Sequence, residues 1–229
     1  MKPITQNVAR TLGRFALFAV LCSSSFAAPV AEVKSVKGEV NLMVAGKATP
    51  MVAGTKLERG AEIRTGNPGR AKLQFIDGSV LIVSDASSFK IEQFEMSSQG
   101  QRRAAQMALD VGLISQVVQP ATDGSWTVRT PTAVTAVRGT EYLVEVGSDQ
   151  VTAVHVKTGS VVVEPSPTPG FMPDPLMRRR SLHPSSLPPP VMLNQPNLGT
   201  VCNMAGRCGN STAWKPERVN ALMDRLSGV

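Results

Sequence analysis

The 229-residue chain is poor in the side chains that most often carry chemistry. Only 4% of its residues are aromatic, and it has two histidines and three cysteines. It contains no Gly-x-Ser-x-Gly turn and no glycine-rich loop leading into a helix, which are typical of serine hydrolases and of phosphate sites. The sequence therefore predicts no enzyme activity, no catalytic residue, no cofactor and no metal site.

A structural role explains each of the few histidines and carboxylates that could suggest catalysis. His155 lies in a β-rich run, residues 151–157, where we expect a strand histidine that is exposed or hydrogen bonded. His183 stands in a proline-rich stretch and is expected to be solvated. Asp77 and Asp85 occupy turn positions, where aspartate commonly accepts hydrogen bonds from its own backbone. A pair of carboxylates at unknown separation does not establish a glycosidase.

The chain also lacks a long hydrophobic run. Its first apolar stretch, Phe15 to Leu21, is far shorter than the roughly 20 residues of a spanning helix. Basic residues precede this stretch and Ser25-Phe26-Ala27 follows it, a pattern typical of a secretory signal peptide. We predict a signal peptide at residues 1–27, cleaved after Ala27, and hence a periplasmic or secreted protein with no stable membrane span.

Two alternatives to cleavage remain open. One is that the stretch is retained as a membrane anchor, although no basic flank follows it. Cys22 also invites lipidation, but the preceding Leu21 is large for the position before a lipidated cysteine.

The main part of the chain has no net charge. The whole chain has a net charge of +7, whereas residues 28–169 hold 14 basic and 14 acidic residues. This balance argues against a nucleic-acid partner, which requires a clustered basic face. The one dense basic run is Arg178-Arg179-Arg180, which is expected to be a solvated linker segment or, alternatively, a contact with an anionic envelope surface.

Cleavage would leave two cysteines, Cys202 and Cys208, with Gly206 between them. An even pair in an exported protein predicts a disulfide. Zinc binding is the alternative, and it would need two further ligands, for which only His155 and His183 are available.

Composition divides the remainder into three parts: a β domain at residues 28–165, a proline-rich linker at 166–200 and a tail at 201–229. The tail holds the cysteine pair and a short helix whose apolar residues nearly share one face. Pro216 suits the first turn of this helix, and Thr212 is the expected cap. The helix is too short to be stable alone and is expected to dock on another element.

The main region predicts strands. Apolar residues alternate with polar or small ones from Ala105 to Leu113, which is the period of a strand. Asp77-Gly78 separates two apolar runs and predicts a tight turn. Residues 141–146 and 151–156 read as a hairpin. Short β segments are expected to begin at Gly38, Gly112 and Gly159, and such a series fits a sandwich, a barrel or an irregular solenoid.

Two stretches of this region resemble the periplasmic FecR domain. The first runs from Gly38-Glu39-Val40 to Phe75-x-Asp77-Gly78-Ser79, and the second, more specific one is Val128 to Tyr142. The resemblance covers about residues 33–146. It implies an all-β, solenoid-like module, with a β-sandwich as the alternative, that serves in sensing or in envelope interactions. The residues that carry its motif, for which we expect structural roles, are Asp77, Gly78, Thr130, Pro131, Val137, Arg138, Gly139 and Thr140.

Founding members of that family carry a cytoplasmic anti-sigma segment and a membrane helix before the module. This chain has a predicted signal peptide in that place, so we expect it to share the module and the compartment but not the regulatory circuit.

The motif has a physical reading as well. Pro131 is expected to end a strand, and Gly139 permits a turn. Arg138 lies between apolar neighbours, which suggests a buried or half-buried guanidinium that holds turn carbonyls or an acid, with Glu141 and Asp110 as candidate partners.

Three functional hypotheses follow from the sequence. The first is a non-catalytic binding or sensing module of the bacterial envelope, with a protein or an envelope polysaccharide as its partner. The second is an assembly protein that docks through its tail, and the third is a cell-wall hydrolase. The oligomeric state stays open.

Overall fold

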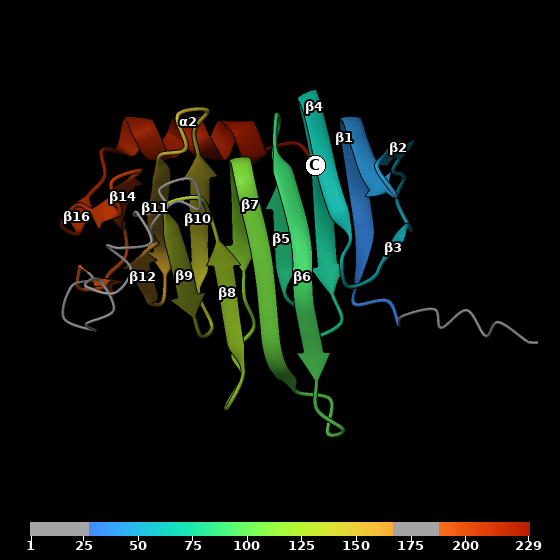
Figure 1. Ribbon diagram of the computed structural model, residues 1–229, viewed down its shortest axis with the longest axis horizontal. Helices are drawn as coiled ribbons and strands as arrows, with labels where there is room; N and C mark the ends of the chain where they lie inside the picture. The colour runs from blue at the N-terminus through green and yellow to red at the C-terminus, as the bar shows by residue number, and fades with distance from the viewer. Residues whose placement is uncertain (1–27, 167–187) are drawn as a thin grey trace, which may run out of the picture.

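Figure 1 shows the computed structural model of the chain, which describes residues 28–166 and 188–229. Strands dominate these residues, and one short helix lies near the C-terminus, so the predicted all-β fold is confirmed. The predicted signal peptide, the Arg178-Arg179-Arg180 run and His183 lie outside the described residues. The helix of the described part is too short and too polar to cross a bilayer.

The strands follow one another along the chain with short connections. The first half contains β1 (Ala31–Val44), β2 (Lys47–Pro50), β3 (Lys56–Leu57), β4 (Glu62–Phe75), β5 (Val80–Val83), β6 (Ser88–Met96) and β7 (Arg102–Val117). The second half contains β8 (Ser125–Arg129), β9 (Ala133–Val137), β10 (Glu141–Val146), β11 (Thr152–Thr158), β12 (Val161–Pro165), β13 (Val191–Leu193), β14 (Leu198–Asn203), β15 (Arg207–Cys208), β16 (Thr212–Ala213) and the helix α2 (Pro216–Leu226).

The 16 strands of residues 28–166 and 188–229 belong to one hydrogen-bonded network that divides at β7. The first half of β7 lies between β6 and β8, while its second half lies between β5 and β10. Two sets of strands continue from there. We call β8, β9, β12 and β13 the β8 branch, and β10, β11, β14 and β15 the β10 branch. The β7–β8 pair is parallel and the other described pairs are antiparallel.

A glycine marks the point where β7 passes from one pair of neighbours to the other. Gly112 has φ 104°, and a Cβ there would lie 2.0 Å from Oγ of Ser87. Both the backbone angle and the space therefore require glycine. The expectation that Gly38 and Gly112 begin strands is wrong, because both lie inside long strands, β1 and β7; Gly159 does precede β12.

The core is aliphatic with a small aromatic centre. The Trp126 ring lies edge-on to Phe75 at a centroid distance of 5.1 Å, and Phe94 stacks on Phe75 at 5.3 Å. The predicted alternation of β7 is confirmed from Ala105 to Leu109, since Ala105, Met107 and Leu109 are fully buried. It does not extend to Leu113, which lies in a separate cluster beneath α2. The expected turn at Asp77-Gly78 joins β4 to β5, and the expected hairpin is the antiparallel pair β10–β11.

The tail is part of the sheet, contrary to the expected division into domain, linker and tail. Strand β13 pairs with β12, and β14 pairs with β11, so residues assigned to the linker and tail extend both branches. Figure 1 shows β14 beside β11 at one end of the sheet, β16 beyond β14, and α2 lying across the ends of several strands. Periodicity could not reveal this, because a three- to six-residue strand carries too little pattern.

The predicted helix forms at Pro216–Leu226 with Pro216 in its first turn. Its N-terminal cap is Lys215 without a side-chain hydrogen bond, so the expected capping by Thr212 is wrong. Leu222 and Leu226 are buried against Leu113 and Leu143, which confirms that the helix docks.

Candidate functional site

The most specific part of the motif is the connection between the two branches. Residues 138–140 join β9 of the β8 branch to β10 of the β10 branch. Gly139 has φ 62°, and a Cβ there would lie 2.9 Å from Cγ of Pro120. Oγ1 of Thr140 donates to the carbonyl of Ser160 at 2.9 Å and accepts from its N–H at 3.3 Å. Ser160 lies in the return connection from β11 to β12, so Thr140 ties both crossings together.

The Thr130-Pro131-Thr132 segment links the branches at another place. Strand β8 ends at Arg129, just before this segment, as the proline predicted. Thr130 and Thr132 each place Oγ1 2.7 Å from Oγ1 of Thr152 on β11. Thr132 also donates to the carbonyl of Cys202 on β14 at 3.1 Å. The buried hydroxyls therefore connect the β8 branch to two strands of the β10 branch.

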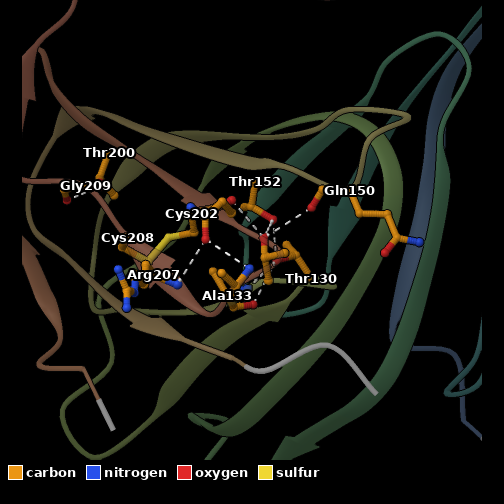
Figure 2. The surroundings of a disulfide bond; sticks show 12 residues. Thr130, Ala133, Gln150, Thr152, Thr200, Cys202, Arg207, Cys208 and Gly209 are labelled. Carbon is orange, nitrogen blue, oxygen red and sulfur yellow. Dashed lines mark hydrogen bonds between the residues drawn. A yellow bond between two sulfur atoms is a disulfide. The ribbon is translucent and has the colours of Figure 1, made fainter. Parts of the chain in front are cut away.

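Figure 2 shows this threonine cluster beside the Cys202–Cys208 disulfide. The disulfide joins β14 to β15 within a tight turn, in which Asn203 Oδ1 accepts from the N–H groups of Ala205 and Arg207. Thr200 closes the other side by donating to the carbonyl of Gly209 at 2.6 Å. The predicted disulfide is thus present, and it fixes the strand that the motif threonines hold.

Arg138 does not have the role expected for it. Its side chain is exposed and makes no hydrogen bond or ion pair within the described residues. The proposed partners are engaged elsewhere, Glu141 with Lys157 at 2.7 Å and Asp110 near Ser88.

The buried arginine is Arg102, which sequence reasoning missed. It forms an ion pair with Asp77, and the two side chains are 1% and 5% exposed. Arg102 also donates to the carbonyl of Gln119 at 2.9 Å and lies over the ring of Trp126. Asp77 accepts from the N–H of Ser79 at 2.9 Å, which confirms the expected turn role. Asp77 therefore holds a turn and neutralises a buried cation at once.

His155 is neither exposed nor satisfied, contrary to expectation. Its side chain is fully buried on β11, and neither ring nitrogen has a hydrogen-bond partner in the described part of the chain. The ring packs against Trp214 with centroids 5.0 Å apart. Burial and the charge of Arg218 both lower the pKa of His155, so the ring is neutral at physiological pH.

Ion pairs and hydrogen bonds of Arg225 and Arg70 hold the C-terminal end of α2. Arg225 donates to Glu145 at 2.7 Å and lies 3.4 Å from Asp85. Arg70 donates to the carbonyls of Arg225 and Ser227 at the helix end. Burial acts to raise the pKa of Asp85, but the hydrogen bond from Ser84 and the charge of Arg225 outweigh it and keep that pKa below its usual range.

One sizeable cavity lies beside the tail rather than beside the motif. It has a volume of about 620 Å³ and lies between β14, β16 and the start of α2. Residues that line it include Thr200, Asn210, Thr212, Trp214, Lys215 and Arg218. A second cavity of about 470 Å³ lies beside Arg138 and Ser160. Within the described residues no group of three or more metal-ligating side chains is found.

Comparisons with known proteins agree with this picture. Residues 61–162 match the FecR family, described as FecR protein. Two crystal structures of a candidate anti-sigma factor from Parabacteroides distasonis ATCC 8503, at 1.65 and 2.50 Å, are similar in fold. Both share 19% identity with this chain and cover 71% of it, with TM-scores of 0.51 and 0.52. The match spans 64% and 63% of those chains, just under two thirds of their length. No curated protein matches.

Proposed function

We propose, because residues 61–162 match the FecR family, that the chain is a non-catalytic binding or sensing module of the bacterial envelope. It acts in the periplasm or outside the cell after cleavage of the leader at residues 1–27. Its partner is a protein or an envelope polysaccharide. Direct contact with a cytoplasmic sigma factor is not part of the proposal, since the expected leader would carry the chain out of the cytoplasm.

One observation supports a non-catalytic role: the threonines of the motif and Asp77 make contacts within the fold, whereas Arg138 is exposed. Thr130, Thr132 and Thr140 make buried hydrogen bonds that join the two branches. Asp77 is occupied by Arg102 and by its own turn. Residues held in this way support a rigid framework, and they leave recognition to the surface around it.

The experiment is a cross-linking capture from the envelope. The full chain is expressed with its leader and an affinity tag, cross-linked in intact cells and recovered, and its bound proteins and glycans are identified. The matched control is Asp77→Ala, in which the buried cation loses its partner and the fold is strongly destabilised. A genuine partner is recovered by the wild type and is lost with the control.

Two results would contradict the proposal. One is that no partner is recovered under several cross-linking conditions. The other is release of soluble fragments from cell-wall material by the purified chain, which would favour a hydrolase instead.

The alternative of an assembly protein that docks through its tail is supported by the edge strand β13. Among the described residues β13 pairs with β12 alone, and its Met192 is 50% exposed. A free apolar edge is a ready template for a further strand. Met192→Lys should abolish capture of the partner if the tail edge is the docking site, whereas a partner bound elsewhere on the module is retained.

A further inference from the structure

The cavity beside the tail contains two cations without acidic partners. Lys215 and Arg218 both line it, and neither forms an ion pair within residues 28–166 and 188–229. Of the residues that line the cavity in this part of the chain, none is acidic. Arg225, the neighbouring arginine on the same helix, is by contrast paired with Asp85 and Glu145.

Arg218 is positioned rather than free. Its guanidinium carbon lies 3.7 Å from the centroid of the Trp214 ring, which is a close cation–π contact. A guanidinium stacked on a ring keeps its N–H donors in its own plane, where they can reach a second group. The stack therefore fixes a charged donor at the wall of the cavity at little entropic cost.

The ring of Trp214 is in turn held by β14 and β11. It lies so close to Gly199 that a Cβ there would be 2.4 Å from both Cε2 and Nε1 of the indole. His155, which faces Gly199 across the β11–β14 pair, packs against the same ring. Since Gly199 has an ordinary backbone angle, space rather than conformation requires glycine at this position.

The remaining lining is polar and small. Thr212 and Asn210 add a hydroxyl and an amide, and Val201, which is 37% exposed, adds a limited apolar surface beside Trp214. Hydroxyl and amide groups suit a ligand rich in hydroxyls, and an aromatic with a small apolar patch suits the C–H edges of a sugar ring. Two unpaired cations favour an anionic ligand.

We infer that this cavity binds a carboxylate-bearing sugar unit of an acidic polysaccharide. Arg218 binds the carboxylate, Lys215 adds a second positive charge, and Thr212 and Asn210 receive the sugar hydroxyls. The charge distribution of the chain agrees, because residues 188–229 hold four basic and two acidic residues while the main region is balanced. The inference rests on the proposed function and names the ligand class and its site.

The test measures binding of the purified chain 28–229 to polygalacturonate by calorimetry at physiological ionic strength. Neutral dextran is the control for charge, and poly-glutamate is the control for the sugar. We expect polygalacturonate to bind, and dextran and poly-glutamate to bind at least tenfold more weakly.

Variants then locate the site. Arg218→Gln should weaken binding of polygalacturonate about tenfold or more, as loss of a charge-assisted hydrogen bond implies. Gly199→Ala should displace Trp214 and weaken binding with no change of charge. Arg138→Gln is the matched control, because it removes an exposed arginine at the other large cavity, and it should bind as the wild type does.

Several results would overturn the inference. Equal affinity for poly-glutamate would make the ligand an acidic protein, and equal losses in Arg218→Gln and Arg138→Gln would place the site elsewhere. Absence of polygalacturonate binding by the folded wild type would also overturn it. In each case a protein partner captured from the envelope would still support the proposed function, so the two failures are distinguishable.

Discussion

The buried ion pair between Arg102 and Asp77 makes the sharpest prediction for a single residue. Asp77→Ala leaves a guanidinium that is 1% exposed without its counter-charge. Removal of one partner from a buried pair typically lowers the free energy of unfolding by about 3–5 kcal/mol. We expect a loss of that size in urea denaturation followed by tryptophan fluorescence, which reports on the adjacent Trp126.

The matched control for this pair lies on the surface. Arg129 and Glu92 form an ion pair whose side chains are 50% and 29% exposed. Exposed pairs contribute about 0–1 kcal/mol, so Glu92→Gln should hardly change the free energy of unfolding. A similar small effect from Asp77→Ala would mean that Arg102 reaches water and is not buried as described.

The sequence analysis expected a buried arginine at Arg138, whereas the buried arginine is Arg102. Strand alternation counted from Ala105 places Arg103 inside and Arg102 outside. A register shift in the β6–β7 pairing pairs Met96 with Arg102 and Glu95 with Ala104, so Arg103 is the extra residue of a bulge. A bulge reverses the inward and outward order, and no local sequence feature announces it.

The burial of His155 leads to a prediction of how the free energy of unfolding depends on pH. Burial, aided by the charge of Arg218, lowers the pKa of His155 in the folded chain below its value in the unfolded chain. The unfolded chain therefore binds the proton more readily, and stability falls as the pH drops below about 6.5. His155→Phe keeps an aromatic ring against Trp214 but cannot titrate.

The measurement is the free energy of unfolding at pH 7 and at pH 5. The loss between these pH values should be smaller in His155→Phe than in the wild type. Asp85 also has a lowered pKa, but its contribution is lost only near and below about pH 4, outside this window. An identical pH dependence in both proteins would show that His155 titrates as a solvated histidine does.

At the scale of elements, α2 is held by two buried leucines and by the polar contacts of Arg225 and Arg70. Leu226→Ala removes one of them from the contact with Leu113 and Leu143. The expected loss of stability is about 2 kcal/mol, the low end for buried leucines, because a helix on the rim can settle into part of the space. Hydrogen exchange should show faster exchange in α2 with little change in β7.

The helix offers its own control. Asn220 is exposed on the same helix, and Asn220→Ala should leave both stability and exchange unchanged or slightly improve them, since alanine favours helices. Equal effects of the two substitutions would indicate that α2 does not rest on the sheet through its apolar face.

Periodicity in the sequence indicates which strands and helix form, but it does not indicate which strands pair with one another. The alternation of β7 up to Leu109, the Asp77-Gly78 turn and the apolar face of α2 are local patterns, and each formed as predicted. The parallel β7–β8 pair and the addition of β14 to β11 depend on contacts between residues far apart in the chain. The candidate cavity was missed for the same reason, because Gly199 and Trp214 acquire their meaning only once β14 joins the sheet.

At the scale of the whole molecule, the motif has one physical purpose. A sheet that divides at β7 must hold its two branches at a fixed distance. Thr140 does so at the crossings, and Thr130 with Thr132 does so beside β14. The disulfide then closes the turn after β14, so the tail that forms the cavity is tied to the framework through the same cluster.

This arrangement makes the redox state of the chain a test of its compartment. A Cys202–Cys208 bond persists in an oxidising compartment and is reduced in the cytosol. We predict that the chain isolated from its native cells begins at Ala28 and has no free thiol, as measured by intact mass before and after alkylation. The same chain made in a reducing cytosol without residues 1–27 should carry two alkylated cysteines.

The stability difference between the two forms follows from the size of the loop. Closure of a ring between residues six positions apart stabilises a chain by about 2 kcal/mol in the loop-entropy description, so the reduced chain should unfold at lower urea. Cys202→Ser with Cys208→Ser should behave like the reduced chain in either compartment. Two reactive thiols in protein recovered from the envelope would contradict this prediction. Native protein found in the cytosol with its leader intact would refute both export and the place of the proposed site in the envelope.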